Sequence, residues 1–180
     1  MVSVRETAHT LARYGSICQD NGLVPIIEPE ILTDGGHTIE ECARISELVF
    51  RTVMQAMLDQ DLIIEGTLLK PNMVTAGSTC EDQGTPEKIA WLTVRTLSRS
   101  IVPALPGVVF LSGGQSEEAA SVNLNAMNKL QNIAKPWALT FSYGRALQQS
   151  VLKAWRGQEA NVAAAQAALL ERASANGAAA

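Results

Sequence analysis

The chain is poor in cysteine, histidine and aromatic residues, and these shortages narrow the classes of protein it can belong to. Its 180 residues contain three cysteines and two histidines, and 4% of them are aromatic. Cys18, Cys42 and Cys80 are odd in number, widely spaced and form no CxxC pair. This pattern favours reduced, mostly buried thiols in a cytoplasmic protein over a disulfide scaffold or a metal site. We assign no role to His9 or His37.

Long hydrophobic runs and a surplus of positive charge are also lacking. The formal net charge of −4 argues against nucleic acid or an anionic membrane as the main partner. No apolar stretch approaches the roughly 20 residues that span a bilayer, and the N-terminus lacks a signal-peptide pattern. With 47% hydrophobic and 18% charged residues, the composition is that of a globular protein with one sizeable core.

What the sequence does contain is a repeated alternation of apolar strands and helices. We expect strands at 23–27, 62–69, 108–111 and 138–141, and helices at 2–21, 39–58, 85–101, 116–130, 145–155 and 159–175. Residues 176–180 read as a frayed tail. Four consecutive βα units with near-continuous apolar strands predict a parallel sheet covered by helices.

Polar residues at the strand ends favour a particular α/β architecture, the TIM (β/α)8 barrel. A barrel needs eight βα units, whereas this sequence supplies four. We therefore expect a single partial domain over residues 1–180, equivalent to strands five to eight of a barrel with flanking helices. Its uncovered inner face would expose apolar side chains and favour pairing or aggregation. The residues expected there are Ile26, Ile64, Val109 and Leu139.

Lys70 is the leading candidate for a reactive residue. It follows the apolar run that ends in Leu68 and Leu69, which would deliver one primary amine to the mouth of the sheet. An amine desolvated there finds its ammonium form costly, so its lone pair becomes available to form a Schiff base with a ketone. The competing interpretation is a solvated charge at the end of a strand, which is the commoner case.

Two strand-to-helix junctions are typical of phosphate sites. In the first, Ser112, Gly113 and Gly114 follow an apolar strand, and a helix with acidic residues in its first turn comes next. Free N–H groups and the positive end of that helix suit an anion. In the second junction, Ser142 and Gly144 precede Arg145, whose planar guanidinium matches phosphate. An ordinary tight βα turn explains one such junction, but two in succession favour anion binding.

Four segments together resemble class I fructose-bisphosphate aldolase. They are 23–30 (LVPIIEPE), 65–74 (EGTLLKPNMV), 110–118 (FLSGGQSEE) and 135–147 (KPWALTFSYGRAL). The likeness extends from about residue 10 to 175 and corresponds to the C-terminal half of that enzyme. The resemblance implies a TIM barrel and reversible cleavage of fructose 1,6-bisphosphate to dihydroxyacetone phosphate and glyceraldehyde 3-phosphate, in glycolysis and gluconeogenesis. It also implies a lyase that needs no metal and no cofactor.

The resemblance assigns roles to individual residues. Lys70 matches the lysine that forms the imine, Glu28 the general acid/base carboxylate, and Glu30 a second, supporting carboxylate. The pocket for one substrate phosphate matches six residues, which are Ser112, Gly113, Gly114, Ser142, Gly144 and Arg145. Glu65 and Asn72 flank the lysine and are expected to line the same cavity. Family members are usually tetramers, so the resemblance also implies a homo-oligomer if the complete chain is present.

Several family features have no match here, which leaves alternatives open. The family uses an aspartate on its first strand, basic residues on other early strands and a mobile tail ending in tyrosine, and none of these can be carried over. One alternative is therefore a truncated half barrel that binds a sugar phosphate or a partner half without efficient catalysis. Another is a different Schiff-base barrel lyase that acts on another phosphorylated ketose.

Overall fold

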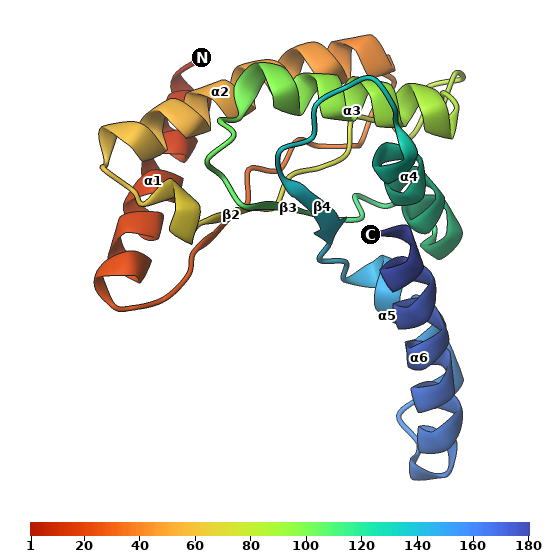
Figure 1. Cartoon of the computed structure of the whole chain (residues 1–180). Helices are drawn as coiled ribbons and strands as arrows, with labels where there is room; N and C mark the ends of the chain where they lie inside the picture. The colour runs from red at the N-terminus through yellow and green to blue at the C-terminus, as the bar shows by residue number, and fades with distance from the viewer.

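A four-stranded parallel sheet forms the centre of the molecule, with helices packed on one face and little on the other (Figure 1). The computed structural model describes all residues 1–180. Along the chain the elements are α1 (Val2–Asp20), β1 (Ile26–Ile27), α2 (Ile39–Asp59), the 3-10 turn η1 (Ile64–Gly66), β2 (Leu68–Leu69), α3 (Pro86–Ser100), β3 (Gly107–Phe110), α4 (Glu117–Lys129), β4 (Ala138–Phe141), α5 (Arg145–Trp155), the 3-10 turn η2 (Glu159–Asn161) and α6 (Val162–Ala179). The strands lie in the order β1-β2-β3-β4 and every pair is parallel. The predicted α/β fold with a parallel sheet is confirmed.

The helices begin where hydroxyl side chains cap them. The Thr38 hydroxyl accepts a hydrogen bond from the Glu41 N–H at the start of α2, and Thr85 does the same for Lys88 at the start of α3. Ser116 caps α4 in the same way. Each cap satisfies one N–H group that the first helical turn leaves without a partner, which stabilises the helix start by about 1 kcal/mol.

The two faces of the sheet differ in what covers them. Ile27, Leu69, Val108 and Leu139 are paired in register and are at most 4% exposed, because the helices pack against this face. Ile26, one residue earlier on β1, points to the other face and is 41% exposed. Side chains alternate between faces along a strand, so one register step separates the core from the open face. Ile26 and the half-buried Val109 match the predicted inner face, whereas the prediction was wrong for Ile64 and Leu139, which are buried.

The first two strands are shorter than the sequence predicts. Leu23 and Val24 are 62% and 68% exposed and lie outside β1, so this segment is not a buried strand. Residues 62–67, which we expected to be part of β2, lie outside the strand, and residues 64–66 among them form the turn η1. An apolar run alone does not distinguish an extended segment from such a turn.

Helix α1 packs against this turn through the side chain of Gln19 and the close approach that Gly15 allows. The Gln19 amide donates to the Ile63 carbonyl at 2.9 Å and to the Thr67 hydroxyl at 3.0 Å, and it accepts from the Ile63 N–H at 3.0 Å. One helical turn earlier lies Gly15, where an added Cβ would come within 2.6 Å of a Leu62 methyl group. Glycine at this position therefore lets α1 approach the turn closely.

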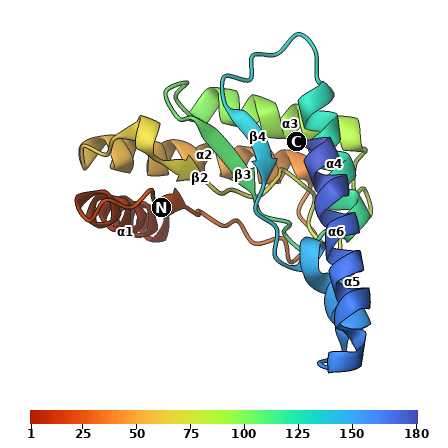
Figure 2. The same ribbon diagram turned by 60° about the horizontal axis from the view of Figure 1, so that its bottom comes forward.

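Helices α5 and α6 form a hairpin that projects away from the sheet (Figures 1 and 2). Helix α6 returns to pack against α4, and it continues to Ala179 instead of fraying after Ala175 as predicted. Asn176 explains this difference, because it is fully buried and its Oδ1 accepts from the Ser121 hydroxyl at 2.6 Å. None of the helices combines the length and the apolarity that a membrane span needs.

Candidate functional site

Lys70 and Glu28 come together at the carboxyl end of two neighbouring strands. Glu28 follows β1 directly and Lys70 follows β2, and the Lys70 N–H donates to the Ile27 carbonyl at 2.8 Å. Because Ile27 pairs with Leu69, the next residue on each strand points to the open face of the sheet. The Lys70 Nζ lies 3.1 Å from a Glu28 carboxylate oxygen. The strand register therefore delivers an amine and a proton acceptor to one place.

The amine of Lys70 is less desolvated than we expected from the sequence. Its side chain is 22% exposed and that of Glu28 is 44% exposed, so water reaches both groups. A partly exposed ion pair of this kind contributes about 1 kcal/mol or less to the free energy of unfolding. The two side chains lie within the distance that direct proton transfer requires.

The Ser112–Gly114 turn presents free backbone N–H groups. Gly113 and Gly114 have φ of +54° and +79°, a region that favours glycine, and neither N–H donates a hydrogen bond within the protein. Gln115 fixes the turn, because its backbone N–H and its side-chain amide both donate to the Ser112 carbonyl at 3.0 Å. Two adjacent free donors in a positive-φ turn form a concave anion-binding surface.

The second junction is held by a buried tyrosine. The Ser142 N–H donates to the Phe110 carbonyl at 2.8 Å, which sets the end of β4 beside the end of β3. Tyr143 packs inward and its hydroxyl donates to the Ala120 carbonyl of α4 at 3.0 Å, and burial raises the pKa of this hydroxyl. The following Gly144 and Arg145 are exposed and open helix α5. Arg145 makes no ion pair, so its guanidinium is available to an anion.

A cavity of about 770 Å³ connects these junctions but does not reach the lysine. Gly113, Gly114, Arg145 and Glu30 all line it. Lys70, Glu28, Ser112, Ser142 and Gly144 do not, so the cavity contains only part of the predicted site. Glu30 therefore lies with the anion-binding groups and makes no ion pair with Lys70.

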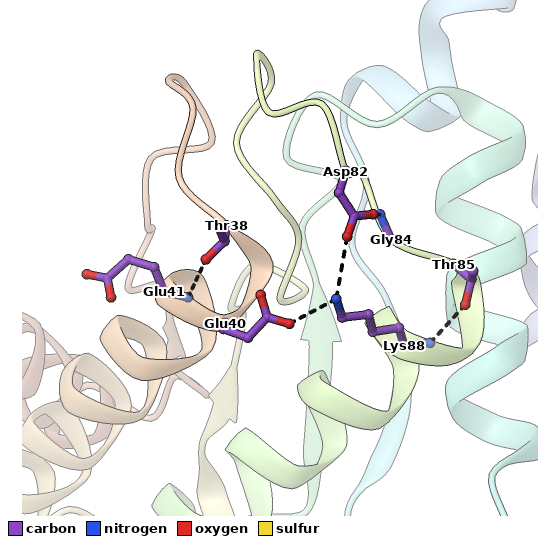
Figure 3. Close-up of polar contacts among 7 residues, drawn as sticks. All are labelled: Thr38, Glu40, Glu41, Asp82, Gly84, Thr85 and Lys88. Carbon is purple, nitrogen blue, oxygen red and sulfur yellow. Dashed lines mark hydrogen bonds and ion pairs between the residues drawn. The ribbon is translucent and has the colours of Figure 1, made fainter.

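One wall of the cavity is held by an exposed charge cluster (Figure 3). The Lys88 ammonium lies 2.9 Å from Glu40 of α2 and 3.7 Å from Asp82, whose carboxylate also accepts from the Gly84 N–H at 2.9 Å. The hydrogen bond from Lys88 lowers the pKa of Glu40, and the same bond raises the pKa of Lys88. The cluster thus ties the loop before α3, which lines the cavity, to the start of α2.

Glu65 and Asn72, which we expected to line the cavity beside Lys70, lie elsewhere. Glu65 is the exposed residue of the turn η1, at the amino end of β2, so it lies at the opposite end of the sheet from Lys70. Asn72 is buried, and its side chain hydrogen-bonds to the backbone of Ile31 instead of projecting into the cavity. Sequence reasoning also missed Gln115 and Thr33 as cavity residues, because no pattern in the chain marks them.

A parallel sheet with helices on one face and polar residues at its carboxyl ends defines an α/β protein of the TIM-barrel family. Comparisons with known proteins agree. The family model described as "Fructose-bisphosphate aldolase class-I" matches residues 1–180. Among curated relatives, fructose-bisphosphate aldolase 2 of Plasmodium berghei is 59% identical over 97% of this chain, and the cytoplasmic isozyme of Spinacia oleracea is 60% identical over 97%.

A solved structure gives the same result. Fructose-bisphosphate aldolase from Plasmodium falciparum, crystallised with TRAP and a small-molecule inhibitor, is 60% identical and superposes over 99% of this chain with a TM-score of 0.96. The chain belongs to the class I fructose-bisphosphate aldolase family. It spans about half the length of the relatives it matches, with 47% to 48% of these two curated proteins and 51% of the crystallised chain covered.

Proposed function

We propose that this chain carries the Schiff-base lysine and one phosphate pocket of a fructose-bisphosphate aldolase. The observation that supports the proposal most directly is the 3.1 Å pair of Lys70 and Glu28 at adjacent strand ends. The reaction is the reversible cleavage of fructose 1,6-bisphosphate to dihydroxyacetone phosphate and glyceraldehyde 3-phosphate. Small phosphorylated sugars are the partners, and the site needs no metal or cofactor.

In the first step Lys70 becomes a nucleophile. Glu28 accepts a proton from the Lys70 ammonium, the freed lone pair attacks C2 of the ketose, and a proton passes from the attacking nitrogen to the former carbonyl oxygen to give a neutral carbinolamine. Glu28 then returns its proton to the new hydroxyl, which leaves as water as the nitrogen lone pair forms the iminium. The short contact between the two side chains supports this exchange, because general acid–base transfer needs hydrogen-bond reach.

The iminium then acts as an electron sink. A base removes the proton of the C4 hydroxyl, the C4 oxygen becomes an aldehyde, and the C3–C4 electron pair moves toward the iminium to give an enamine. Glu28 is the carboxylate positioned for this proton. Protonation of C3 and addition of water to the iminium release dihydroxyacetone phosphate and restore Lys70.

The phosphate pocket combines both strand-end junctions with Arg145. We propose that the N–H groups of Gly113 and Gly114 and the guanidinium of Arg145 bind phosphate oxygens. Ser112, Ser142 and Gly144 belong to the same two junctions but lie outside the lining of the cavity, and we propose that they bind the phosphate from its rim. The β3–β4 register supports this assignment, because Phe110 pairs with Phe141 and so places the two junctions side by side. Glu30 is a supporting carboxylate of the same region.

Trapping the imine tests the proposal. The chain is incubated with dihydroxyacetone phosphate and reduced with borohydride, and the modified lysine is located by mass spectrometry. We expect the adduct on Lys70 alone. Lys135 provides an internal control, because its ammonium is occupied by the carbonyls of Met127, Asn128 and Leu130 at 2.7 to 3.0 Å.

The outcomes separate the proposed activities. An unmodified Lys70, or equal labelling of Lys135, would contradict the Schiff-base role. An adduct without cleavage of fructose 1,6-bisphosphate would favour a chain that binds sugar phosphate without efficient turnover.

We further propose a cytoplasmic location and a homo-oligomeric state. The names of relatives from Arabidopsis thaliana and Spinacia oleracea, a cytosolic aldolase and a cytoplasmic isozyme, support the location.

A further inference from the structure

Asn72 is a buried side chain that joins two strand ends of the site. It is 2% exposed and lies two residues after Lys70. Its Oδ1 accepts from the Ile31 N–H at 2.7 Å, and its Nδ2 donates to the Ile31 carbonyl at 2.9 Å. The primary amide therefore bonds both polar groups of one backbone residue, much as a neighbouring strand would.

The chain needs this substitute because the backbone ladder ends early. The last hydrogen bond between the two segments runs from the Lys70 N–H to the Ile27 carbonyl. In a parallel ladder the next donor on the β1 side would be residue 29, which is proline and has no N–H. Glu28 lies directly after the last ladder bond, and the Asn72 contact resumes at Ile31. Without Asn72, the segment that carries Glu28 and Glu30 would have no backbone hydrogen bond between Ile27 and Thr33, whose carbonyl accepts from the Ser78 N–H at 2.8 Å.

Asn72 also lies close to the Gly113 turn, which we propose binds the substrate phosphate. A Cβ added to Gly113 would lie 3.5 Å from the Asn72 Nδ2 and 3.5 Å from a Thr33 methyl group. Asn72 therefore belongs to the segment after β2, is hydrogen-bonded to the segment after β1 and lies next to the turn after β3. The distance between the amine, its carboxylate and the anion-binding turn depends on these contacts.

We infer that Asn72 is a positioning residue that holds Glu28 within proton-transfer distance of Lys70 and sets the spacing to the Gly113 turn. The inference rests on the proposed function, because its effect on rate has meaning only if Lys70 forms an imine. It does not require Asn72 to touch substrate. A displacement of about 1 Å at such a site costs up to about 100-fold in rate.

Two variants test the inference. Asn72→Ala removes both hydrogen bonds to Ile31. Asn72→Asp keeps the acceptor but replaces the donor, so its ionised form places a carboxylate oxygen against the Ile31 carbonyl. The protonated form, which acid restores, can again donate to that carbonyl. The Asp variant is therefore a switch that acid returns to the native bonding pattern.

We expect the rate of borohydride-trapped adduct formation at saturating dihydroxyacetone phosphate to fall about 10- to 100-fold in both variants at neutral pH. The rate relative to the native chain should recover in Asn72→Asp as the pH is lowered and stay low in Asn72→Ala. Asn176→Ala is the matched control, because Asn176 is an equally buried asparagine on α6. It should lower stability without lowering the trapping rate of the folded chain.

Hydrogen exchange at the Ile31 amide gives a readout that needs no substrate. We expect this amide to be protected in the native chain and to exchange at least about 10-fold faster in Asn72→Ala. Two results would overturn the inference while leaving the proposed function intact. One is a trapping rate in both variants equal to that of the native chain. The other is a ratio of the Asn72→Asp trapping rate to the Asn72→Ala trapping rate that does not change with pH. A native chain without any Lys70 adduct would instead refute the proposed function, and unchanged Ile31 exchange would then refute the positioning role separately.

Discussion

Neighbouring residues on each strand point to opposite faces of the sheet, and the two faces differ in burial and in the side chains they carry. On the covered face, Ile27, Leu69 and Val108 are fully buried and belong to a core cluster of 33 buried residues. On the open face, Lys70 meets Glu28 in the presence of water. The comparison teaches that the sheet divides stability and chemistry between alternate residues. A substitution on one face should therefore affect one property and spare the other.

The largest expected effect is on chemistry, from Lys70→Met. The variant cannot form an imine, so the trapped adduct and any cleavage should fall by at least about 1000-fold. Its free energy of unfolding should change by about 1 kcal/mol or less, because the ion pair it removes is partly exposed. Mass spectrometry measures the adduct and urea unfolding measures the stability. Loss of folding in this variant would show that the open face also stabilises the chain.

The next effect compares neighbouring valines on β3. Val108→Ala empties part of the covered core and should lower the free energy of unfolding by about 2–3 kcal/mol. Val109 is half buried and on the open face, so Val109→Ala should cost less than about 1 kcal/mol. Denaturant unfolding of the two variants provides the measurement. Equal losses would contradict the division between the faces.

A smaller effect is expected at the Gly113 turn. Alanine in this positive-φ conformation costs about 1–2 kcal/mol. Gly22→Ala is the control, since Gly22 has a φ of +73° and an added Cβ would meet nothing within 4 Å. Both variants should lose similar stability in thermal unfolding. Only Gly113→Ala should raise the concentration of dihydroxyacetone phosphate that gives half-maximal trapping, and an equal rise in Gly22→Ala would speak against a phosphate turn.

The smallest effect concerns the Lys88 cluster and depends on pH. Glu40 has a pKa below its ordinary value of 4.5, so its contribution to stability is present above pH 4.5 and is lost as the pH falls through the lowered value. Lys88 has a pKa above 10.5, so its contribution is present below pH 10.5 and is lost at higher pH. Lys88→Met should therefore be slightly less stable than the native chain near neutral pH. Unfolding curves recorded near pH 3 should show that this difference disappears, and a constant difference would contradict the pairing.

The strand order and the position of the candidate Schiff-base lysine follow from sequence patterns that act locally. Apolar runs, capping hydroxyls and glycine turns predict where β3, β4 and the helices begin, because each pattern is read within a few residues. The extent of β1 and β2 could not be predicted in this way. Residues 62–64 are as apolar as a strand, but they lie outside β2 and lead into the turn η1, where Gln19, 44 residues before Ile63, bonds to the Ile63 backbone.

The site shows the same limit. Glu28 and Lys70 each stand out at the end of an apolar segment, but their 3.1 Å contact depends on the register between strands. The role of Asn72 depends on a hydrogen bond to a residue 41 positions away. The cavity was also beyond sequence reasoning, because its walls come from four separate loops and helix starts. Long-range register, set by packing of the whole sheet, decides these contacts.

The contact of α1 with the turn η1 also restricts how the chain can fold. Gly15 admits the Leu62 side chain, and Gln19 makes its three bonds only at this docking position. If the helix slid by one turn, Leu11 or Gln19 would collide with Leu62 and the amide of residue 19 would be left without partners. Shifted positions of α1 therefore have a higher free energy than the observed one. The small apolar face of this helix would otherwise allow several alignments, so these contacts favour a single native arrangement.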